Sequence, residues 1–108
     1  MEDQQLYLEF QELVNMAPAE IEKWLKDDHS KEVGLVKEGS SESQGRKSAR
    51  KIIYIKRKKK DELTEEDYAH MSKVVSYIKR HLAQRPSHEV KDTKWRYSLK
   101  NWGHEPLQ

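Results

Sequence analysis

The spacing of apolar residues after position 64 constrains the fold more than any other feature of the chain. Five apolar residues recur at alternating intervals of three and four positions: Tyr68, Met71, Val75, Ile78 and Leu82. That interval puts them on one face of an α-helix. Thr64 precedes three carboxylates, Glu65 to Asp67, and a capping residue followed by acidic side chains favours a helix start. We therefore expect a helix here, closed by Pro86, which cannot continue the hydrogen-bond ladder.

Three other segments carry the same helical signal. Leu6, Phe10 and Val14 predict a first helix over residues 4–15, and Pro18 predicts the start of a second, without a good capping residue at Ala17. A third helix is predicted over residues 46–60, although its Ile52–Ile55 segment is also compatible with a strand.

The ends of these helices leave two more segments. Thr93 or Asp92 can cap a short C-terminal helix that presents Trp95, Leu99 and Trp102 and stops at Gly103. Residues 29–45 are rich in Gly and Ser and lack apolar periodicity, so we expect a flexible loop there. A loop of that length is unusual in a small domain unless it has a function or contains a short turn.

Length and composition fix the class of protein. At 108 residues, of which 34% are hydrophobic, the chain has enough apolar surface for one thin core. We predict an all-α single domain over residues 1–108, with four main helices and a short C-terminal helix. The absence of Cys excludes disulfides and thiolate chemistry. The acidic N-terminus does not resemble a signal peptide and no apolar run is long enough to span a bilayer, so we expect a cytoplasmic protein.

The net charge of +2 hides four blocks of opposite sign. Residues 1–45 sum to −7, residues 46–60 to +9, residues 61–71 to −5 and residues 72–108 to +5. Such asymmetry is typical of a basic surface that meets phosphates, or of acidic and basic segments that pack on each other. The sequence leaves both interpretations open.

A helical wheel of the basic segment predicts a candidate binding surface. Five cations and one tyrosine fall within about a third of the circumference, opposite the side that carries Ile52. With the adjoining Lys59, this basic stripe comprises Arg46, Lys47, Arg50, Tyr54, Arg57, Lys58 and Lys59. Lys73 and Arg80, on the polar face of the next helix, extend it. Cations in this arrangement are suited to contacts with a phosphate backbone.

Catalytic and metal-binding chemistry is not indicated. The five histidines include no pair spaced four apart, and no HExxH, GxSxG or glycine-rich phosphate loop is present. Glu65, Glu66 and Asp67 are explained by their place in a first helical turn. We predict no enzyme activity, no cofactor and no metal.

Several strings identify a family resemblance over nearly the whole chain. The most specific are Trp-Arg-Tyr-Ser-Leu at residues 95–99 and Asn-Trp-Gly-His at residues 101–104. The chain resembles domain of unknown function family 3140, small bacterial and fungal proteins. Some members of that family are labelled as DNA-binding proteins, so the resemblance implies DNA binding and an association with stress-related proteins. It implies no mechanism and no site residues.

The sequence thus predicts a protein that binds nucleic acid, with DNA the first choice of ligand and RNA the second, through phosphate contacts with weak sequence preference. Six neutralised phosphates would give a slope near −5 for log K against log salt on duplex DNA, at about −0.9 per contact. The alternative is a protein-interaction or stress-associated module whose basic helix docks on an acidic protein surface. No membrane partner is expected, because the apolar side of the basic helix is too small to anchor it.

Overall fold

The structure, a computed structural model, describes residues 3–33 and 42–108, and its regular elements are all helical. In these two ranges, six α-helices and one 3-10 turn follow one another: α1 (Asp3–Leu13), α2 (Pro18–Leu25), α3 (Asp28–Lys31), α4 (Gln44–Lys56), the turn Lys60–Glu62, α5 (Glu65–Leu82) and α6 (Lys94–Asn101). The predicted all-α class is confirmed.

The ends of α5 and α6 follow the predicted signals. The Thr64 hydroxyl accepts the Asp67 amide at 3.1 Å, and the Asp67 carboxylate accepts the Thr64 amide at 3.0 Å, which closes a capping box. At the end of α6, Gly103 has a φ of 82°. The His104 amide donates back to the Leu99 carbonyl at 3.0 Å, so the helix ends in a Schellman motif that requires this glycine.

The basic helix is shorter than predicted. It begins at Gln44, because the Ser43 side chain accepts the Arg46 amide at 3.2 Å, and it ends at Lys56. Arg57 to Lys60 therefore lie beyond the helix. Like charges spaced four apart on one helix repel each other, whereas the cations of this segment reach different partners once the helix has ended.

The predicted loop over residues 29–45 is partly wrong. Asp28–Lys31 form the short helix α3, whose start is capped by Asp27 through a 2.8 Å bond from the His29 amide. Residues 44 and 45 belong to α4. Of the remaining residues of the predicted loop, 34–41 lie outside the described part of the chain.

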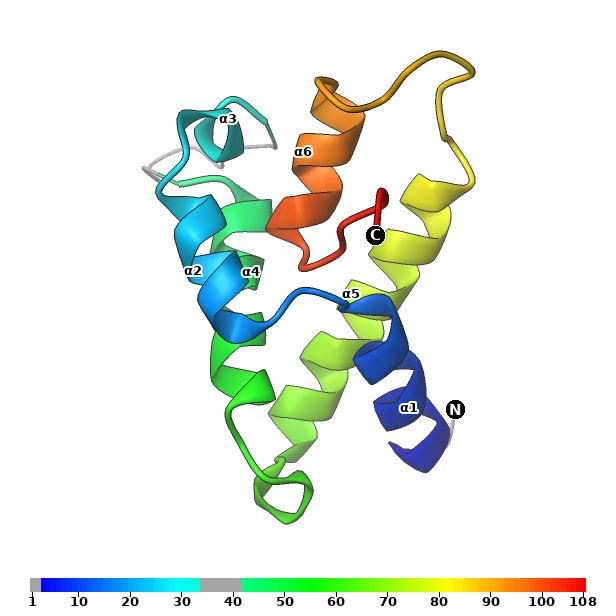
Figure 1. Cartoon of the computed structure of the whole chain (residues 1–108). Coiled ribbons are helices and arrows are strands. Elements are labelled where there is room, and N and C mark those ends of the chain that lie inside the picture. Colours follow the sequence, from blue (N-terminus) through cyan, green and yellow to red (C-terminus); the bar gives the residue numbers. More distant parts are fainter. Residues whose placement is uncertain (1–2, 34–41) are drawn as a thin grey trace.

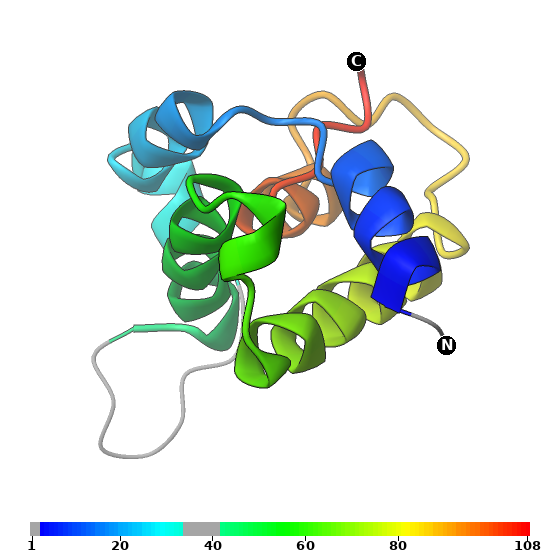
Figure 2. The same ribbon diagram turned by 90° about the horizontal axis from the view of Figure 1, so that it is seen from below.

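The helices form pairs around a shared core. α1 packs on α5 and α2 packs on α4. α4 and α5 join at the 3-10 turn and diverge from it, and α6 lies between their far ends (Figures 1 and 2). Six large side chains with exposed fractions below 2% fill the centre: Phe10, Ile21, Ile52, Met71, Ile78 and Leu99. Trp95 and Trp102 are also buried in this core, as the helical spacing predicts.

A buried polar cluster connects four of the helices. The Arg46 guanidinium on α4 donates from Nη1 to the Leu25 carbonyl at 2.9 Å and to the Ser30 hydroxyl at 2.7 Å. Leu25 ends α2, so its carbonyl has no partner within the helix. The Ser30 hydroxyl on α3 in turn donates to Asn101 Oδ1 on α6 at 2.6 Å.

The same amide oxygen of Asn101 also accepts a 2.7 Å bond from the indole nitrogen of Trp24. Asn101 Nδ2 donates to the Ser30 carbonyl at 3.1 Å. Ser30 and Asn101 are almost fully buried, and Arg46 is 8% exposed. Buried polar groups are costly unless they are hydrogen-bonded, so this polar cluster holds α2, α3, α4 and α6 in one arrangement.

We expect Arg46→Met to lower the free energy of unfolding by about 2–3 kcal/mol, because it removes two bonds from a charged donor and leaves buried acceptors short of a partner. The matched control, Arg50→Met, removes a more exposed ion pair and should cost less than about 1 kcal/mol. Urea unfolding followed by circular dichroism measures both. Equal losses in the two variants would contradict a special role for Arg46.

Candidate nucleic-acid interface

The arginines of the predicted basic stripe are paired within the protein. Arg50 makes two bonds to the Glu42 carboxylate, at 3.1 and 2.6 Å, and Arg57 makes two to Glu22, at 3.3 and 2.7 Å. These bonds lower the pKa of both carboxyl groups. The side chains of Arg50 and Arg57 stay 56% and 53% exposed. The two arginines are thus neutralised by the chain's own carboxylates but are not buried.

Arg46, predicted as a contact residue, is instead enclosed by the fold. Its side chain is only 10% exposed, it belongs to the buried polar cluster, and its Nε lies 3.4 Å from Glu42. A phosphate cannot reach a guanidinium that the fold encloses in this way. The acidic N-terminal part of the chain supplies Glu22 and Glu42, so acidic and basic segments do pack on each other at these arginines.

The cations that end the basic segment serve as internal contacts as well. Lys56 donates to the Val14 carbonyl at 2.8 Å, and Lys58 pairs with Asp67 at 2.6 Å. Lys60 bonds to Gln4 and lies over the Tyr7 ring. Lys59 is exposed, but its neighbours on both sides are engaged, so it does not continue a row of free charges.

A different set of cations remains available on α4 and α5, and two of them, Lys51 and Lys73, line one hollow between these helices. Lys47 and Lys51 lie one turn apart on α4, and Lys73 and Arg80 lie two turns apart on α5. All four are exposed, and none forms an ion pair with another described residue. Three of them were predicted from the sequence, whereas Lys51 was missed. Its position, one turn from Lys47, was the signal that pointed to it.

His70 lies between these helices, half-buried and close to two of the lysines. Its imidazole lies at hydrogen-bond distance from the Ser48 hydroxyl, at 2.9 Å. Burial, followed by repulsion from Lys51 and Lys73, lowers the pKa of His70 to about 4. Lys51 of α4 and Lys73 of α5 therefore both lie close enough to disfavour a positive charge on the His70 ring. We call the set Lys47, Lys51, Tyr54, Glu66, His70, Lys73 and Arg80 the α4–α5 surface.

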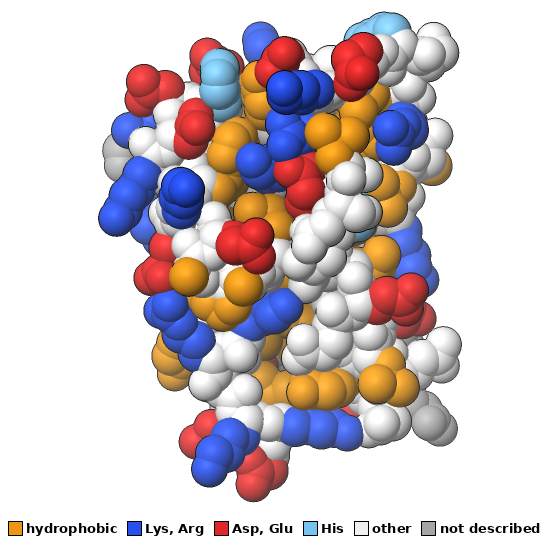
Figure 3. All heavy atoms as spheres, viewed as in Figure 1, with side chains coloured by type: hydrophobic (Ala, Val, Ile, Leu, Met, Phe, Trp, Pro, Cys, Tyr) orange, Lys and Arg blue, Asp and Glu red, His pale blue; other side chains and the backbone are white. Residues whose placement is uncertain are grey.

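Other parts of the molecule carry charges of both signs or lack the grouping that a metal site needs. On the face shown in Figure 3, Lys and Arg side chains alternate with Asp and Glu. Within the described ranges, no three His, Asp or Glu side chains are grouped so that they can hold a metal ion. No helix in that part of the chain has the length and apolar character needed to cross a membrane.

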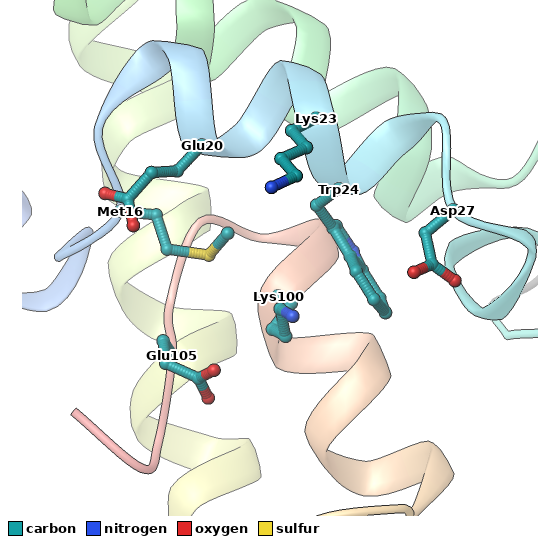
Figure 4. A pocket seen from close by; sticks show the side chains of 7 residues that line it. All are labelled: Met16, Glu20, Lys23, Trp24, Asp27, Lys100 and Glu105. Carbon is teal, nitrogen blue, oxygen red and sulfur yellow. The ribbon is translucent and has the colours of Figure 1, made fainter.

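A hollow of about 320 Å³ between α2 and α6 is lined by groups that the fold already uses (Figure 4). Its Glu20 and Asp27 carboxylates accept backbone amides at 2.8 Å, and Glu105 pairs with Arg96. The Lys100 ammonium lies 3.9 Å from the centroid of the Trp24 ring. Because these groups hold one another, the hollow is a weaker candidate for a ligand than the α4–α5 surface.

Comparison with known proteins identifies one family. The model of the family described as "Protein of unknown function (DUF3140)" matches residues 9–100. No match is found among curated proteins or among solved structures.

We expect nuclear magnetic resonance titration to give His70 a pKa of about 4, and Lys51→Gln/Lys73→Gln to raise it by removing two repelling charges. The unfolded chain, with a His pKa near 6.5, takes up the proton first. The contribution of His70 to the free energy of unfolding is therefore complete above pH 6.5 and is lost as the pH falls from 6.5 to about 4. A His70 pKa of 6.5 or higher would contradict this arrangement.

Proposed function

The chain belongs to the DUF3140 family, and we propose that it binds the phosphate backbone of nucleic acids through the α4–α5 surface. The observation that carries the proposal is the set of four exposed cations on two adjacent helices, none of which forms an ion pair with another described residue, with Lys51 and Lys73 lining one hollow beside His70. Exposed cations of this kind supply the affinity of proteins that contact phosphates without reading the bases.

The internal pairing of Arg46, Arg50 and Arg57 revises the expected strength of binding. Four available cations replace the longer stripe expected from the helical wheel. At about −0.9 per phosphate on duplex DNA and about −0.7 on single strands, they give a slope of about −3 to −4 for log K against log salt. Affinity should be modest and should fall steeply with salt.

The test is a salt titration of binding to random-sequence duplex and single-stranded oligonucleotides, with the Lys51→Glu/Lys73→Glu variant beside the wild type. We expect the reversal to abolish binding at moderate salt, because it replaces two attractive charges with two repulsive ones. Arg50→Glu/Arg57→Glu is unsuitable, since each new carboxylate would face Glu42 or Glu22 and would destabilise the fold.

The matched control is Lys23→Glu/Lys94→Glu, which makes the same change in net charge at exposed positions on α2 and α6. It should bind nearly as well as the wild type. Equal loss in the two variants would mean that only net charge matters. Absence of binding by the wild type at low salt, or a response that does not depend on salt, would reject the proposal in favour of an acidic protein partner.

A further inference from the structure

An aromatic ring lies exposed beside the cations of the α4–α5 surface. Tyr54 is 63% exposed, although its chain neighbours Ile53 and Ile55 are buried in the core. A single exposed aromatic side chain is common on protein surfaces and needs no partner to explain it. Its setting is what points to a ligand.

The Tyr54 ring contacts a lysine that is itself held in an ion pair. The Lys58 ammonium lies 4.5 Å from the centroid of the Tyr54 ring and is itself held by Asp67 at 2.6 Å. Both members of this pair are largely buried, with side chains 17% and 11% exposed. A ring that is positioned before binding loses less conformational freedom when a ligand contacts it.

Two adjoining hollows connect the ring to the lysines. The first, of about 200 Å³, is lined by Tyr54 and Ile55 of α4, by Asp67 of α5, and by three shared residues. The second, of about 350 Å³, is lined by Ala69, Lys73 and the same three residues, which are Lys51, Glu66 and His70. The surface thus runs from an aromatic end to a cationic end along the boundary between two helices.

This combination favours a single strand over a duplex. Proteins that bind single strands pair a cationic groove, which follows the backbone, with aromatic rings on which bases stack. In a duplex the base faces are already stacked on one another, so a tyrosine reaches one only after unstacking, which costs free energy. A single strand offers the same face without that cost.

One group in the hollows opposes an anion. The Glu66 carboxylate lines both hollows, is exposed, and forms no ion pair with another described residue. Asp67 lines only the first hollow, and Lys58 neutralises it. Glu66 should therefore weaken the binding of any phosphate that lies near Lys51.

Resting on the proposed function, we infer that the α4–α5 surface prefers single-stranded nucleic acid, with one base stacked on Tyr54 and the adjacent phosphate held by Lys51 and Lys73. The ring supplies a contact that does not depend on salt, and the lysines supply one that does. Sequence preference should be weak, because every base has a face that can stack.

The experiment measures fluorescence anisotropy of labelled oligothymidine and of a random duplex of the same length at low salt. Tyr54→Ala should weaken binding of the single strand by about 5- to 100-fold, the range expected for one stacked base, and leave duplex binding unchanged. Tyr54→Phe, which keeps the ring, should bind like the wild type. Glu66→Gln should tighten binding of both, because it removes a repelling charge.

The outcomes separate this inference from the proposed function. If Tyr54→Ala binds the single strand as well as the wild type does, while Lys51→Glu/Lys73→Glu loses binding, the stacking contact is rejected and phosphate binding stands. Equal or tighter binding of the duplex by the wild type also overturns the preference. If the wild type binds neither oligonucleotide, both ideas fail. Tyr54 is exposed, so its variants should unfold at the wild-type temperature, which a thermal melt checks.

Discussion

The buried guanidinium of Arg46 is the contact on which the orientation of α4 depends. It joins the end of α2 to α3 and, through Ser30, to Asn101 on α6. A buried cation is stable only with its partners in place. The contacts of Arg46 therefore fix the rotational orientation of α4 about its own axis. With Arg46 facing inward, Arg50 and Arg57 lie on the side of α2, and Lys51 and Tyr54 lie on the side of α5. The surface available to a ligand is therefore a consequence of a core contact.

This orientation separates the arginines from the lysines. All three arginines of the basic segment contact a carboxylate of the acidic N-terminal part, two of them through paired bonds. The planar guanidinium matches a carboxylate in that way, whereas an ammonium acts as a point charge on a flexible stem. Lys47 and Lys51 form no such ion pair with the described residues. The three arginines therefore act within the fold, whereas Lys47 and Lys51 leave their charge exposed to solvent.

The fold was predictable where apolar periodicity extends over several turns and a capping residue marks the start. In α5, Thr64 and the apolar residues from Tyr68 to Leu82 indicate the same helix. α3 was not, because four residues are too few to show a helical period. The site was predictable only in part. A helical wheel shows that Arg50, Tyr54 and Lys47 lie on one stripe of the helix. It does not show that the arginines of this stripe face α2 while Tyr54 faces α5. Glu22 lies 35 residues from Arg57, a pairing that no local pattern reveals.

Internal pairing changes what a cation contributes without removing it from the site. An ion pair such as Lys58 with Asp67 adds little net charge, so it scarcely attracts a distant phosphate. It does fix the Lys58 ammonium over the Tyr54 ring, and through that contact it sets where the ring stands. The attraction of distant phosphates thus comes from Lys51 and Lys73, which form no ion pair with another described residue. The position of the Tyr54 ring is set by Lys58, which is paired. On the proposed function, a surface divided in this way should attract polyanions of many kinds and should release most slowly those that also present an unstacked base.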